Sequence, residues 1–185
     1  MRARAPTGDC TPVNQCVTLR RGTLGTVEDT FLSGDQPNWV AGTESSLWTG
    51  KSGGGNENRI LLKFDLSSIP PSADVTSAIL TAGISWNMVP TGPSIHEVLG
   101  PWSEATTSLS NFTAAVDPAP IASFPAGFGY LSANLTNVVS DWVQFPSSNF
   151  GVQIRDTLPA SHLIWSSEAS LTNRPKLDVC YTICQ

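Results

Sequence analysis

The chain has 185 residues, a formal net charge of −5, 40 % hydrophobic residues and only 14 % charged residues. This length suits one domain with a buried core. The acidic balance argues against a general binder of nucleic acid or anionic membranes, and no apolar run is long enough to span a bilayer. The 14 prolines and 15 glycines are spread along the chain, as many turns between short strands require.

Residues 1–22 are interpreted as an N-terminal arm, and residues 23–185 as the folded domain. The opening MRARAPTGDC lacks the apolar segment of a signal peptide. We therefore expect that the chain is part of a longer protein, that a signal has been removed, or both. Within the arm only residues 17–19 have strand character. We expect the arm to dock on its own domain or on a neighbouring molecule.

The four cysteines lie at the chain ends, and with only two histidines present they favour disulfides over a zinc site. Disulfides indicate an oxidising compartment. Pairing between the first and last strands would join the termini, and local pairs are the main alternative. A local pair at the C-terminus needs a turn, because four residues of extended strand span about 13 Å. Intermolecular bonds stay open. The cysteines are Cys10, Cys16, Cys180 and Cys184.

Alternation of apolar and polar residues predicts short strands throughout the chain. The clearest strand turns Ile60, Leu62 and Phe64 toward one face, and Pro70 and Pro71 follow its end. Apolar residues at helical spacing predict a short helix at 135–143 that caps the fold, and residues 103–128 are interpreted as a connection between sheets. The prediction is an all-β, two-sheet antiparallel jelly-roll β-sandwich with one short helix. Further strands are expected at 26–33, 45–49, 75–86, 94–99, 130–135, 149–156, 162–167 and 176–183.

Several motifs occur in a recognisable order: VEDTFLS, RILLKFDLSSIPPSADVTSAIL, VLGPWSEATTS, NFGVQIRD, WSSEAS and NRPKLDVCYT. Together they resemble the DNRLRE or disaggregatase-related domains, grouped with carbohydrate-binding module family 96, over roughly residues 27–181. The resemblance implies a jelly roll in a secreted bacterial or archaeal protein, often beside polysaccharide lyases. It also implies that acidic polysaccharides such as alginate are bound through basic residues in some members. The cysteine-bearing arm and tail are additional to this pattern.

A basic face is the first candidate binding surface. Arg59 and Lys63 share one face of the clearest strand, and the family layout would place Arg155 outward in the same sheet. Three cations on one sheet of an acidic chain suit uronate carboxylates, which arginine binds in bidentate fashion. The alternative is ordinary surface ion pairs, with Asp65, Asp156 and Glu168 as the partners.

The six tryptophans are divided by position. Trp39 and Trp48 lie beside loops and are the candidates for stacking on sugar rings, with packing under a loop as the alternative. Trp102 is expected to plug a corner. The remaining tryptophans are expected in the core, because their strand or helix phase looks inward. These are Trp86, Trp142 and Trp165.

A structural calcium ion is considered between Asp29 on the first domain strand and Asp178 on the last, with backbone carbonyls completing an oxygen shell. The alternative is that these acids pair with Arg174 or Lys176. No loop of the EF-hand type supports the ion.

No catalytic constellation is evident, so the chain is not expected to be an enzyme. His96 and His162 lack a nucleophile motif, and Glu104 with Glu168 is only a nominal glycosidase pair.

Two functions are therefore considered. The first is a non-catalytic, extracellular module that binds an acidic polysaccharide. The alternative is a self-associating subunit of an extracellular filament, coat or matrix, whose arm donates a strand to a neighbour's sheet.

Overall fold

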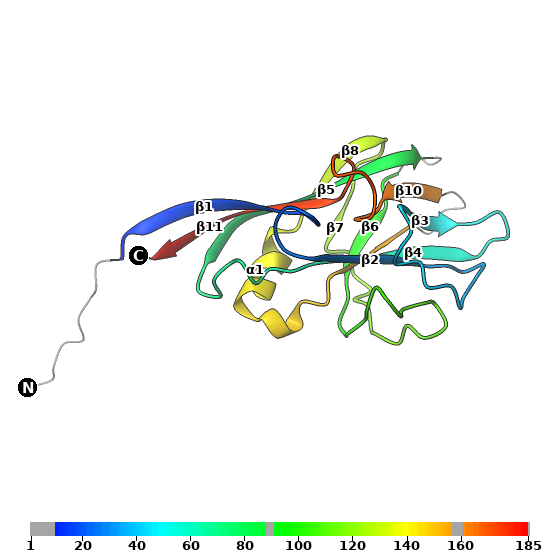
Figure 1. Ribbon diagram of the computed structural model, residues 1–185, viewed down its shortest axis with the longest axis horizontal. Coiled ribbons are helices and arrows are strands. Elements are labelled where there is room, and N and C mark those ends of the chain that lie inside the picture. Colours follow the sequence, from blue (N-terminus) through cyan, green and yellow to red (C-terminus); the bar gives the residue numbers. More distant parts are fainter. Residues whose placement is uncertain (1–9, 88–90, 157–160, 185) are drawn as a thin grey trace, which may run out of the picture.

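A computed structural model describes residues 10–87, 91–156 and 161–184 (Figure 1). The first nine residues of the predicted arm lie outside this range. The predicted strands and the short helix are present with small shifts of their ends, which confirms the all-β class. The elements are β1 (Pro12–Leu19), β2 (Val27–Leu32), β3 (Ser46–Lys51), β4 (Glu57–Phe64), β5 (Asp74–Asn87), β6 (Ser94–Glu97), β7 (Ala122–Ser123), β8 (Gly129–Asn134), α1 (Thr136–Gln144), the short 3₁₀ turn η1 (Pro146–Ser148), β9 (Val152–Arg155), β10 (Ser161–Trp165) and β11 (Lys176–Cys184).

The strands form two antiparallel layers that join at one side. One layer has the order β1-β11-β5-β10-β3. Strands β11 and β10 pair with successive parts of the long strand β5, along one edge, and β8 pairs with its opposite edge. The second contains β2, β4, β9, β6 and β7. A short pairing of β3 with β4, Gly50 with Asn58 and Lys51 with Glu57, links the layers into one curled sheet. This is a jelly-roll-like β-sandwich, as predicted.

The core lies between the two layers, and α1 closes part of its edge. Strand β4 turns Ile60, Leu62 and Phe64 inward, as its alternation predicts. Helix α1 buries its apolar stripe, including Trp142, whose Nε1 donates to Glu97 Oε1 at 2.8 Å. The core position of Trp142 is thereby confirmed. In the described part of the chain, no helix has both the length and the apolar character needed to cross a membrane.

The outer face of the second layer is partly covered by the connection between β6 and β7. Leu32, Leu61 and Val98 form a second buried cluster there, against which Trp102 and Phe112 pack. The Trp102 Nε1 also donates to the Phe150 carbonyl at 2.7 Å, consistent with the predicted plug. Leu61 is an apolar residue on the outward face of β4. The connection packs over it and shields it from water.

The arm strand is longer than predicted and lies on its own domain. Strand β1 pairs with β11 along its whole length, from Pro12 opposite Cys184 to Leu19 opposite Leu177. Figure 1 shows the two strands side by side, projecting beyond α1. Cys16–Cys180 joins the two strands, and Cys10–Cys184 joins the segment just before β1 to the end of β11. Pairing between the two ends of the chain is thus confirmed, and the local alternative is wrong. Strand donation to a neighbouring molecule stays untested.

Candidate functional site

The three predicted cations lie in the second layer, but they do not form one surface. Arg59 on β4 is directly opposite Arg155 on β9, and Lys63 follows four residues further along β4. Between them Leu61 is fully buried under the connection that covers this face. The layer therefore presents an arginine pair at one end and Lys63 about 13 Å away along the strand.

The partners of these cations differ from those predicted as the alternative. Lys63 Nζ pairs with Glu28 Oε1 at 2.9 Å and lies 5.4 Å from the centre of the Trp102 ring. Arg59 Nη2 pairs with Glu57 Oε2 at 2.7 Å. The predicted partners Asp65, Asp156 and Glu168 are thus wrong for these two residues.

Arg155 is held by neutral groups. Its Nη2 lies 3.2 Å from His96 Nδ1 and donates to the Pro118 carbonyl at 3.3 Å. Within residues 10–87, 91–156 and 161–184 it forms no ion pair with a carboxylate. Burial lowers the pKa of His96, and the charge of Arg155 contributes to this lowering. The Asp117 carbonyl lies 2.9 Å from His96 Nδ1 and can only accept, so Nδ1 carries the proton and Arg155 contacts the ring without donating to this nitrogen.

The two tryptophans proposed for stacking line the same pocket. This pocket has a volume of about 270 Å³ and lies near the junction of the two layers. Trp39 is half-buried, with its ring edge-on to Phe31 at a centroid distance of 5.1 Å, whereas Trp48 is 38 % exposed. Polar side chains complete the lining; they are Ser33, Asp35, Gln36, Ser52 and Asn58.

Hydrogen bonds fix the polar side of this pocket. Asp35 Oδ1 accepts from Ser52 Oγ at 3.0 Å and from Asn56 Nδ2 at 2.8 Å. Asn58 Oδ1 accepts from the Gly34 amide at 3.0 Å. A sugar ring has an apolar face and a rim of hydroxyls, and aromatic walls with positioned polar groups match both features.

Two tryptophans predicted for the core lie elsewhere, and that prediction is wrong for both. Trp86 is 53 % exposed because a β-bulge inverts its phase: Ile84 pairs with Ile164, but Trp86 pairs with Leu163. Trp165 is half-buried and lies over Gly83, where an added Cβ would approach its Cδ1 to 2.8 Å.

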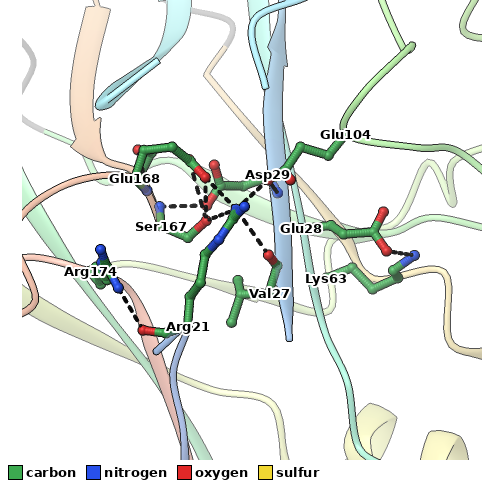
Figure 2. A network of polar contacts seen from close by, with 10 residues as sticks. Arg21, Val27, Glu28, Asp29, Lys63, Glu104, Ser167, Glu168 and Arg174 are labelled. Atoms are coloured by element: carbon green, nitrogen blue, oxygen red, sulfur yellow. Dashed lines mark hydrogen bonds and ion pairs between the residues drawn. The ribbon is translucent and has the colours of Figure 1, made fainter. Parts of the chain in front are cut away.

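A second polar cluster surrounds Arg21, which was assigned to the arm from the sequence and missed as a partner (Figure 2). Its Nη1 contacts Glu168 Oε1, Glu104 Oε1 at 2.8 Å and Ser167 Oγ at 2.9 Å. Carboxylate oxygens of these two glutamates and Asp29 lie within 4.8 Å of one another. Arg21 therefore forms an ion pair with each of the two glutamates.

The acids considered for calcium are placed differently from one another. Asp29 belongs to this cluster, is fully buried, and accepts from the Ser167 amide at 2.7 Å. Burial raises its pKa well above the ordinary value, and the charge of Glu168 adds to the rise. Asp178 pairs with Lys176 at 2.7 Å, as the alternative predicted for it. In the described chain the guanidinium of Arg21 supplies a positive charge at the cluster, and the calcium ion stays a prediction.

Comparison with known proteins assigns the family. The model of carbohydrate-binding module family 96 matches residues 21–181, a range that starts at Arg21 and leaves β1 outside. A search of curated proteins found no match. Since the family model covers most of the chain, this protein belongs to carbohydrate-binding module family 96.

Proposed function

We propose that this chain is a non-catalytic module of a secreted protein and that it binds an acidic polysaccharide. Family membership supports a carbohydrate ligand. The observation that carries the proposal is the pocket lined by Trp39 and Trp48, whose aromatic walls and fixed polar groups suit a sugar ring. Two disulfides within the chain favour an oxidising compartment, and therefore secretion.

The arginine pair supplies the preference for acidic sugars in this proposal. Arg59 directly follows Asn58, a residue of the pocket lining, so its side chain lies on the other face of β4, where it is opposite Arg155. Like charges directly opposite each other on neighbouring strands are destabilising. An anionic ligand would offset that cost, because a uronate carboxylate accepts two parallel hydrogen bonds from a guanidinium.

The test compares binding of alginate, a polyuronate, with binding of the same polymer after its carboxyl groups have been reduced. Affinity electrophoresis measures both. The unmodified protein should bind alginate more tightly than the reduced polymer. The double variant Arg59→Ala/Arg155→Ala should lose roughly tenfold in alginate affinity and with it the preference, while Trp48→Ala should weaken binding of both polymers.

Lys63→Ala is the matched control, since it removes one cation from the same strand that, like Arg59, is paired with a glutamate, but lies about 13 Å from the arginine pair. It should leave both affinities unchanged. A preference for alginate that survives in the double variant would contradict the role of the arginines. Release of reducing or unsaturated ends from either polymer would contradict the non-catalytic assignment.

A further inference from the structure

The outer face of the first layer carries a row of large side chains across three strands. Leu163 of β10 lies opposite Trp48 of β3 on one side and opposite Trp86 of β5 on the other. Side chains directly opposite on antiparallel strands share a face. That face is toward solvent, because both tryptophans are exposed while His162 and Ile164, the neighbours of Leu163, are buried. We call Trp48, Leu163 and Trp86 the aromatic row.

The row starts at the pocket and leads away from it. Trp48 belongs to both, so the two surfaces are continuous. Trp48 and Trp86 are separated by two interstrand spacings, roughly 10 Å. In an extended polysaccharide chain this is about the step between one sugar ring and the next but one, so both tryptophans can contact alternate rings of a single chain.

The surface beside the row is also aromatic and is held in place. Tyr130 on β8 lies opposite Gly83 of β5, and its hydroxyl donates to Asn173 Oδ1 at 2.8 Å. Trp165 covers Gly83 from the β10 side. Contiguous exposed apolar surface of this kind marks a binding surface on a soluble domain. In a carbohydrate-binding family, next to a pocket with sugar-binding character, the occupant is a glycan.

We propose that the aromatic row extends the pocket into a linear track, in which a polysaccharide chain crosses β3, β10 and β5 and stacks sugar rings on Trp48 and Trp86. The choice of ligand class rests on the proposed function. The track itself recognises ring faces and chain length, and it does not require charge. The track lies on the first layer and the arginine pair on the second, so the two can be tested separately.

The experiment is calorimetric titration with two series of oligosaccharides of increasing length, one from alginate and one from a neutral β-1,4-linked glucan. The affinity of the unmodified protein should rise with length in at least one series. Trp86→Ala should bind the shortest ligands normally but lose the rise, being roughly tenfold weaker for the longest. Phe145→Ala removes an aromatic ring that is 62 % exposed at the end of α1, away from the row, and should behave like the unmodified protein.

The outcomes separate the track from the acidic preference. Retention of the full rise by Trp86→Ala would overturn the track, whatever the arginine variants show. A rise with the neutral series alone, lost in Trp86→Ala, would support the track and refute the acidic ligand. Binding of neither series would overturn both proposals. If light scattering shows that the unmodified protein self-associates and Trp86→Ala does not, with length dependence intact, the row is a contact between copies and the track is refuted.

Discussion

The two disulfides are nested, and this makes the cost of removing them non-additive. Cys10–Cys184 encloses Cys16–Cys180; the inner bond joins β1 to β11, and the outer bond joins the segment just before β1 to the end of β11. The perturbation is removal of each bond separately, by paired replacement of its cysteines with serine, and then of both bonds together. Free energies of unfolding are compared with that of the intact protein.

The magnitude follows from loop closure in the unfolded chain. The bonds span sequence separations of 174 and 164, so whichever bond is present closes a loop that costs the unfolded state about 5 kcal/mol. A second bond then encloses only the 10 residues by which the separations differ, which is worth about 3 kcal/mol. Loss of either bond alone should therefore cost about 3 kcal/mol, and loss of both about 8 kcal/mol, more than twice the single effect.

Urea unfolding followed by circular dichroism measures these differences, and light scattering measures size in parallel. Both single-bond variants should lose a similar free energy of unfolding. The protein without disulfides should be only marginally folded, because its loss is comparable to the whole free energy of unfolding of a typical domain. The scattering mass should stay that of one chain with and without reductant, since both bonds are intramolecular. If one bond carried nearly all of the loss and the other none, local contacts would outweigh loop closure and the nested reasoning would be refuted. A larger assembly that dissociates on reduction would revive the self-associating alternative.

Other predictions concern the interior. Burial lowers the pKa of His162, so the unfolded chain binds this proton first; the stability it contributes is present above about pH 6.5 and is lost as the pH falls below that value. His162→Gln should therefore flatten the acid side of a curve of unfolding free energy against pH. An unchanged curve would show that His162 does not cause the loss of stability at acid pH. Gly83→Val should cost about 1–3 kcal/mol in urea unfolding, because its side chain meets Trp165; an unchanged midpoint would show that the ring moves freely. Arg21→Met should lower the free energy of unfolding by about 2 kcal/mol. This lies between the values for exposed and for buried ion pairs, because the Arg21 side chain is 38 % exposed. Greater thermal stability of that variant would show that the acids around Asp29 do not need the cation.

Much of the fold follows from residue alternation because the core imposes it directly. Ile60, Leu62 and Phe64 on the inward face of β4 are apolar, and a shift by one would bury Arg59 and Lys63, so only one phase is acceptable. Strand β1 has no such constraint. Of its residues, PVNQCVTL, only Leu19 is buried, and β1 forms a strand because β11 and two disulfides hold it. Local sequence predicted strand character only for residues 17–19 because the remaining stabilisation is tertiary.

The candidate site was predicted only in part, and the reason is a single extra residue. Trp39 and Trp48 were selected by their positions beside loops, and the structure brings them into one pocket. Strand phase predicts an inward Trp86, but the β-bulge between Ile84 and Trp86 makes Trp86 pair with the outward Leu163. Where a strand bulges depends on the register of its partner, and register is set by contacts between residues far apart in the chain. The alternation of β5 therefore predicts the correct face for Ile84 but the wrong face for Trp86. The same bulge that defeats the prediction turns Trp86 from a core residue into one that can face a ligand.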